Sequence, residues 1–157
     1  MKTIAIFVDV QNIYYTTREV FDRQFNYRKF WQQVSAEGKI VAANAYATDR
    51  GDDKQHKFQR ALEHIGFTIK LKSYIQRSDG SSKGDWDVGI TIDILETVKD
   101  VDVVILLSGD GDFDLLLEKI KTEYNVTAKV YGVPGLTAKS LIESASIYHP
   151  IEGDLLL

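Results

Sequence analysis

Runs of apolar residues alternate along the chain with segments of helical periodicity. The apolar runs that predict strands are Thr3–Val10, Ile40–Ala47, Phe67–Ile75, Val103–Leu107 and Val126–Tyr131. Three of these runs are almost continuously apolar, as expected for strands that helices cover on both faces. In Phe67–Ile75 apolar and polar residues alternate instead, which predicts a position near the edge of the sheet.

The segments between these runs have the spacing of helices. The predicted helices are Asn12–Phe21, Tyr27–Ser35, Asp53–Ile65, Asp85–Val98, Asp112–Glu123 and Leu136–Ser144. Strands that alternate with helices are typical of strand–helix–strand units, so we expect an α/β fold with a mostly parallel central sheet of about five strands. No repeat or linker divides the chain, and residues 1–157 are predicted to form a single domain.

Composition narrows the class of protein. The chain has no cysteine, which fits a reducing compartment, and no apolar stretch of the roughly 18 residues that span a bilayer. Its first eleven residues predict a buried strand rather than a signal peptide. We therefore expect a cytoplasmic protein with no membrane segment. A net charge of −4 argues against a strongly basic nucleic-acid coat, although an enzyme whose acidic pocket binds cations remains compatible with it.

Four aspartates follow elements that should end at one edge of the sheet. Asp9 ends the first strand, Asp110 and Asp112 follow the fourth, and Asp87 lies in the first turn of the helix Asp85–Val98. Ligands of open α/β sheets bind beyond the carboxyl ends of the strands. Two carboxylates about 4 Å apart repel by roughly 4 kcal/mol at an effective dielectric near 20, so such a group requires protons or cations. Oxygen ligands favour Mg²⁺ or Mn²⁺.

Less specific interpretations exist for the same aspartates. Each one alone is more often a helix cap or turn former. The spacing after Asp110 imitates an EF-hand loop, but Leu115 and Lys121 occupy the positions that require Gly and Glu. An aspartyl-phosphate phosphatase needs a second Asp where this chain has Gln11.

The helix Asp85–Val98 has a predicted orientation. Its apolar period predicts that Val88, Ile92 and Leu95 form the buried stripe, with Asp87 at the border of that stripe, where a side chain faces a cleft. Asp93 points away from Asp87 around the helix and is expected to be solvated.

Three motifs in the same order resemble a known family. They are Asp9-Val10-Gln11-Asn12, Lys83-Gly84-Asp85-Trp86-Asp87-Val88 and Ser108-Gly109-Asp110-Gly111-Asp112-Phe113. With this order over roughly Ile4 to Ile147, the chain resembles the NYN domain family in its LabA-like branch. The resemblance implies a three-layer Rossmann-like (PIN-like) nuclease fold and a metal-dependent ribonuclease. It implies that Asp9, Asp87, Asp110 and Asp112 are the catalytic, metal-binding acids, and that Asn12 supports the first of them or contacts substrate.

Candidate substrate contacts surround the predicted site. The polar loop Gln76–Gly84, which we expect to be mobile, carries Arg77 and Lys83 as phosphate contacts. Tyr14, Tyr15 and Trp86 border the same edge, where they would stack the bases of single-stranded RNA.

The sequence is compatible with alternatives for both function and oligomeric state. The domain would serve as a non-catalytic RNA-binding or protein-binding regulator if it kept the acidic pocket without turnover, and the residues do not separate RNA from DNA. Phe30 and Trp31 would serve the face of a homodimer as readily as the core.

Overall fold

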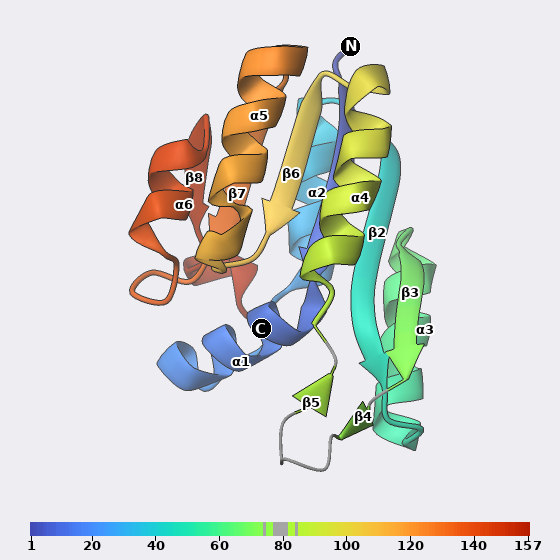
Figure 1. The fold of residues 1–157 in the computed structure, drawn as a ribbon. Coiled ribbons are helices and arrows are strands. Elements are labelled where there is room, and N and C mark those ends of the chain that lie inside the picture. The colour runs from blue at the N-terminus through green and yellow to red at the C-terminus, as the bar shows by residue number, and fades with distance from the viewer. Residues whose placement is uncertain (74, 77–81, 84) are drawn as a thin grey trace.

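The computed structural model places a six-stranded parallel sheet at the centre of the molecule (Figure 1). The structure describes residues 1–73, 75–76, 82–83 and 85–157. In spatial order the strands are β3 (Thr68–Ser73), β2 (Lys39–Asp49), β1 (Thr3–Asp9), β6 (Val103–Leu107), β7 (Thr127–Gly132) and β8 (Ile147–Pro150). Every neighbouring pair in this sheet is parallel.

Helices cover both faces of the sheet and make three layers (Figure 1). The helices on one face are α1 (Val10–Phe21), α2 (Tyr27–Glu37) and α3 (Asp53–Ile65), and those on the other are α4 (Asp87–Thr97), α5 (Asp114–Tyr124) and α6 (Lys139–Ser144). Alternate residues of β1 serve the two cores, because side chains along a strand point to opposite faces. Ile4, Ile6 and Val8 join the core under α1–α3, while Ala5 and Phe7 join the core under α4–α6.

The order of the strands reverses between β1 and β6. From β1 the chain builds β2 and β3 toward one edge, and later it builds β6, β7 and β8 toward the other. Connections on the two sides of this switch point diverge to opposite faces, which leaves a crevice beyond the carboxyl ends of the two central strands. The ends of β1 and β6 are therefore where a ligand site is expected.

The predicted fold class is confirmed. The sheet has one strand more than the five predicted runs, because β8 is short, ends in Pro150 and carries too few apolar residues to be recognised. β3 lies at an edge of the sheet, as the alternation in Phe67–Ile75 predicts. Part of the predicted loop Gln76–Gly84 is instead a small antiparallel ribbon, in which β4 (Ile75–Gln76) pairs with β5 (Ser82–Lys83). Residues 77–81 and 84 lie outside the described residues.

The predicted buried stripe of α4 is wrong for Val88 and Ile92, whereas Leu95 is partly buried and packs against the core. Val88 is 71% exposed and Ile92 is 50% exposed, whereas Ile90 and Ile94 are fully buried. The helix carries apolar residues on more than one face, so its period does not select which face packs on the sheet. Asp87 precedes Ile90 by three residues and is partly buried, with its carboxylate beside those of Asp110 and Asp112.

Asp93 is also placed differently from the prediction of a solvated side chain. Its carboxylate accepts a hydrogen bond from the Tyr46 hydroxyl at 2.7 Å and forms an ion pair with Lys70 at 2.9 Å. Both partners come from neighbouring strands of the sheet, β2 and β3, and are remote in sequence. Sequence spacing within one helix carries no information about such partners.

Phe30 and Trp31 both pack inside the molecule. Phe30 is fully buried and lies edge-on to Tyr131, and Trp31 contacts the ring of Phe67 at a centroid distance of 5.1 Å. Their packing is explained by the core, so they give no support to a dimer face. Among the described helices, none combines the length and the apolar character that a membrane crossing needs.

Candidate metal centre

Asp9 ends β1 and caps the first turn of α1. Its carboxylate accepts a hydrogen bond from the Ser108 hydroxyl at 3.2 Å and a longer one from the Asn12 main-chain N–H at 3.5 Å. Burial raises the pKa of Asp9 from 3.8 to about 6, and the charges of Asp110 and Asp85 add to this shift, while the two hydrogen bonds oppose it. Asp9 is thus a carboxyl group whose charge is costly without a cation.

The loop after β6 is fixed to the rest of the site by its own main chain. The buried Ser108 hydroxyl accepts a hydrogen bond from the Asp110 N–H at 3.1 Å, and the Gly109 N–H donates to the Asn12 side-chain oxygen at 2.9 Å. Asp110 in turn accepts from the Asp112 N–H at 2.9 Å, which begins the short 3₁₀ turn Gly111–Phe113 before α5. The loop is therefore ordered by contacts that need no ligand.

Gly109 is required by the close approach of another chain segment. A Cβ atom at this position would overlap the main-chain carbonyl oxygen of Leu136. The absence of a side chain lets the loop carrying Asp110 lie against the segment that precedes α6.

Asp87 reaches the same place from the start of α4. Burial raises its pKa from 3.8 to about 7, and a hydrogen bond to Asp110 and the charges of Asp110, Asp85 and Asp9 contribute further. One carboxylate oxygen from each of Asp87, Asp110 and Asp112 lies within 4.8 Å of the other two. Side chains from two remote parts of the chain thus bring three negative charges together.

This group suits a small divalent cation. Metal–oxygen bonds of about 2.1 Å place two oxygen ligands of one Mg²⁺ no more than about 4.2 Å apart, so the three carboxylates need only a small closing movement to share an ion. All donors are oxygen atoms, which favour Mg²⁺ or Mn²⁺ over softer metals. Asp9 adjoins the three through Ser108 and through its charge on Asp87. The predicted aspartates are therefore neighbours, three in one group and the fourth beside it.

The predicted substrate contacts have different surroundings. The Trp86 indole N–H donates to the Ala47 carbonyl at 2.9 Å, its ring packs on Tyr46 at 5.2 Å, and the Lys72 ammonium lies 4.5 Å from the ring centroid. These contacts already occupy the indole N–H and the ring of Trp86. Tyr14 and Tyr15 are about half exposed on α1. Arg77 and the side chain of Lys83 lie outside the part of the chain that the structure describes.

Ser108 is the residue of the site that the sequence reasoning missed. Its hydroxyl is buried and joins Asp9 to the main chain of Asp110. A polar residue directly after a fully apolar strand, inside the third motif, was the available signal.

The fold and the site together define a three-layer α/β domain with carboxylates gathered at the switch point of a parallel sheet. Residues 3–152 match the NYN domain family model, as the three motifs suggested. The chain belongs to the NYN domain family, which is part of the PIN-like nuclease superfamily.

One relative supports the family assignment, and two solved structures share the fold. The low amplitude and bright protein LabA of Synechococcus elongatus is 30% identical over 156 residues, a match that covers 92% of this chain and 81% of LabA. A crystal structure of a Vibrio parahaemolyticus protein of unknown function is 52% identical with a TM-score of 0.94, covering 99% of this chain and 96% of that one. Ribokinase from Giardia lamblia is similar in fold alone, with 12% identity and a TM-score of 0.50 over 95% of this chain and 57% of its own.

Proposed function

We propose that this protein is a metal-dependent nuclease that hydrolyses phosphodiester bonds of RNA at the site formed by Asp9, Asp87, Asp110 and Asp112. The observation that carries the proposal is the crowding of the last three carboxylates within 4.8 Å of one another, with the pKa of Asp87 raised to about 7. With its pKa raised this far, Asp87 carries its charge at neutral pH more readily when a cation lies beside it. Membership of a family within the PIN-like nuclease superfamily supports hydrolysis as the use of that cation.

The residues of the site have two roles: some would bind the metal ion, and others position the loop that carries its ligands. Asp87, Asp110 and Asp112 would hold Mg²⁺ or Mn²⁺, which when bound lowers the pKa of water and offsets charge on phosphate oxygens. Asp9, the fourth predicted metal ligand, adjoins these three and accepts a hydrogen bond from the Ser108 hydroxyl. Asn12 fixes the same loop through its bond to the Gly109 N–H. Through these hydrogen bonds Asp9 and Asn12 would also keep the loop in register with the end of β1.

Two further roles remain predictions about the substrate. Arg77 and Lys83 would contact phosphates from the segment between β3 and α4, since cationic side chains bind the nucleic-acid backbone without regard to sequence. Single-stranded RNA is the substrate we favour, because the exposed tyrosines of α1 near the site suit unpaired bases.

The test replaces Asp110 and Asp112 together with Asn and measures cleavage of a labelled single-stranded RNA in Mn²⁺. We expect cleavage to fall by about 100-fold or more, because even the hydrogen-bond partners of metal ligands are worth 10–100-fold. Asp114→Asn is the matched control, since Asp114 adjoins the same loop but bonds its own helix at the Leu115 N–H.

The results separate the proposal from its rival. Unchanged cleavage by the double variant would exclude this site as the catalyst. If Mn²⁺ raises the melting temperature of the natural protein but no RNA is cleaved, the domain is a metal-stabilised binding module instead.

A further inference from the structure

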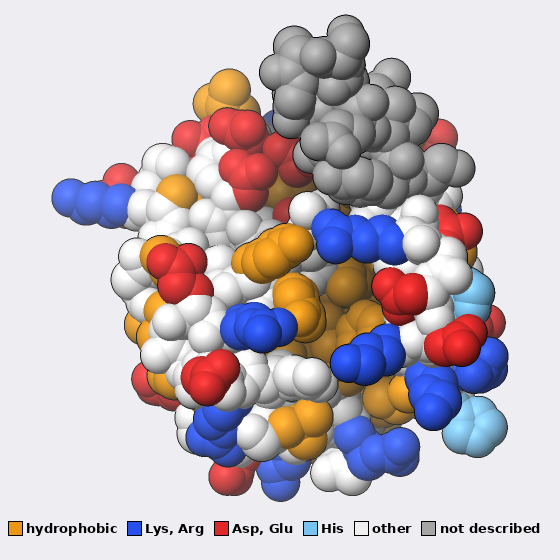
Figure 2. All heavy atoms as spheres, turned by 90° about the horizontal axis from the view of Figure 1, so that it is seen from below, with side chains coloured by type: hydrophobic (Ala, Val, Ile, Leu, Met, Phe, Trp, Pro, Cys, Tyr) orange, Lys and Arg blue, Asp and Glu red, His pale blue; other side chains and the backbone are white. Residues whose placement is uncertain are grey.

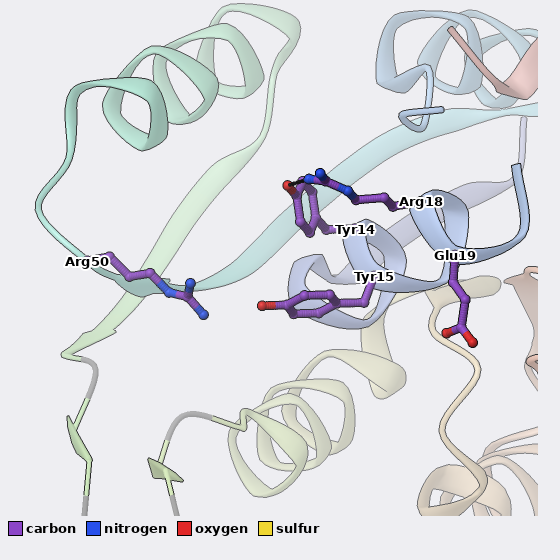
Figure 3. A pocket seen from close by; sticks show the side chains of 5 residues that line it. All are labelled: Tyr14, Tyr15, Arg18, Glu19 and Arg50. Carbon is purple, nitrogen blue, oxygen red and sulfur yellow. Dashed lines mark hydrogen bonds between the residues drawn. The ribbon is translucent and has the colours of Figure 1, made fainter. Parts of the chain in front are cut away.

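A hollow lies beside α1 on the face to which the carboxyl ends of the strands point (Figure 3). Its volume is about 460 Å³, and it is lined by Tyr14, Tyr15, Arg18, Glu19 and Arg50. In Figure 3 the ring of Tyr15 points from α1 toward Arg50, which follows β2, while Glu19 points away from Arg50. The hollow thus combines aromatic rings and guanidinium groups from two separate segments.

The two tyrosines offer aromatic surface to solvent. Tyr14 is 43% exposed and Tyr15 is 48% exposed, and their rings meet edge to face with centroids 5.3 Å apart. Neighbouring aromatic rings at the surface are suited to stack a planar base, because every base has a π-face. The perpendicular arrangement lets one ring stack while the other closes the side of the pocket.

Arg18 holds one of these rings in place. Its guanidinium donates a hydrogen bond to the Tyr14 hydroxyl at 2.6 Å and lies 5.8 Å from the centroid of that ring. Arginine has five N–H donors in a planar fork that matches phosphate, and Tyr14 takes one of them. Tyr14 is therefore the fixed wall of the hollow, and Tyr15 is the ring that can stack a base.

The hollow is close to the acidic site along α1. Tyr14 follows Asp9 by five residues, which is roughly 8 Å along a helix axis. Figure 2 shows this face of the molecule: acidic side chains gather on one part of it, and Lys and Arg side chains surround a hollowed hydrophobic area on another. A chain with a net charge of −4 thus presents positive charge locally, beside its carboxylates.

We propose that this hollow binds one nucleotide of a single-stranded nucleic acid whose neighbouring phosphate lies at the acidic site. Tyr15 stacks the base, Tyr14 flanks it, and Arg18 and Arg50 contact the adjoining phosphates. The part of this proposal that places a neighbouring phosphate of the nucleic acid at the acidic site rests on the proposed function. The binding of a nucleotide in the hollow does not. Stacking needs an unpaired base, so the site selects single strands over duplexes.

The test measures the affinity of the full-length protein for labelled 12-nucleotide RNA and DNA of mixed sequence by fluorescence anisotropy in EDTA, so that no metal-dependent cleavage interferes. Tyr15→Ala should weaken binding of both single strands roughly 10-fold, and Tyr15→Phe should not, because stacking uses the ring and not the hydroxyl. The same sequence as a duplex should bind more weakly than the single strand, and Tyr15→Ala should not change its affinity.

The arginines are tested through salt dependence. Each phosphate contact on a single strand contributes about 0.7 to the slope of log affinity against log salt concentration. The double variant Arg18→Ala, Arg50→Ala should therefore reduce that slope by about 1.4. The matched control is Lys39→Ala, Lys99→Ala, which removes the same charge at the opposite, amino-terminal end of the strands. It should leave the slope unchanged.

Two results would overturn the inference. One is a Tyr15→Ala protein with the same affinity for single strands as the natural protein, and the other is an equal slope of log affinity against log salt concentration for the two double variants. Cleavage measured in parallel separates this inference from the proposed function. Intact cleavage with unaffected binding in Tyr15→Ala refutes the hollow alone, and tyrosine-dependent binding without any cleavage refutes the nuclease alone.

Discussion

Replacing Asp9 with Asn tests whether the buried charge of this carboxyl group, close to other carboxylates, limits the stability of the metal-free protein. The pKa of Asp9 rises from 3.8 to about 6 in the folded chain. Between these pH values the unfolded chain has released the proton that the folded chain still holds, so unfolding releases a proton and becomes easier as the pH rises. The stabilising contribution is therefore complete below about pH 4 and is lost by about pH 6 to 7.

The pKa shift of Asp9 sets the size of this loss of stability. A difference of roughly two pKa units at about 1.4 kcal/mol each gives about 3 kcal/mol of stability lost between acidic and neutral pH. Asn is neutral at every pH, and its amide oxygen still accepts one of the two hydrogen bonds that Asp9 accepts. We expect Asp9→Asn to be more stable than the natural protein by up to about 3 kcal/mol at pH 7.5 in EDTA.

The measurement is urea unfolding in EDTA at several pH values from 4.5 to 7.5, with free energies obtained by linear extrapolation. The informative quantity is the difference between the variant and the natural protein. Burial lowers the pKa of His149, which gives an opposite trend with pH, but this trend is common to both proteins and cancels in the difference. With added Mn²⁺ at pH 7.5 the natural protein should instead be more stable than Asp9→Asn, because it has the additional carboxylate beside the ion.

A stability difference that stays constant between pH 4.5 and pH 7.5 would refute the reasoning. So would an Asp9→Asn protein that is less stable than the natural one at neutral pH in EDTA. Either result would mean that Asp9 is charged in the folded protein at little cost, and that this carboxylate does not need a cation beside it.

Further substitutions probe the surroundings of the site. Ser108→Ala removes the hydroxyl that donates to Asp9, and we expect Mn²⁺ affinity, measured by calorimetry at pH 7.5, to fall about 10-fold to 100-fold. Gly109→Ala forces a methyl group against a main-chain carbonyl oxygen and should lower the free energy of unfolding, measured in urea, by about 1–3 kcal/mol. Tyr46→Phe removes the hydrogen bond to the Asp93 carboxylate and should cost about 2 kcal/mol in the same assay, while RNA cleavage stays unchanged.

The central strands were predictable because their surroundings are uniform. β6 is buried along its whole length and β1 along all but its ends, so continuous apolar runs identify them without knowledge of their neighbours. The acids at their ends could be placed for the same reason, since parallel strands end at one edge. The aspartates of the site follow directly from this pattern and from the first turn of α4.

The predictions from sequence were wrong where contacts with residues remote in sequence determine which side chains are buried or paired. The apolar residues of α4 fit two faces, and only contact with the sheet selects Ile90 and Ile94. Asp93 is held by Tyr46 and Lys70, which no local pattern connects to it. The hollow beside Tyr15 has the same origin, because Arg50 comes from the end of β2 and reaches α1 only through the fold.

The contacts of the site divide it into a part that is already built and a part that an ion would complete. Asp9, Ser108, Asn12 and the Gly109–Asp110 main chain form a closed set of hydrogen bonds between the ends of β1 and β6, the two strands at the switch point. Asp87 belongs to another segment and meets this set at Asp110; burial, the hydrogen bond to Asp110 and the neighbouring negative charges raise its pKa to about 7. The carboxylates that approach one another therefore come from the first turn of α4 and from the loop after β6. A cation placed there would offset both the burial of the Asp87 charge and its repulsion from the neighbouring carboxylates, and it would leave in place the hydrogen bonds that hold the loop.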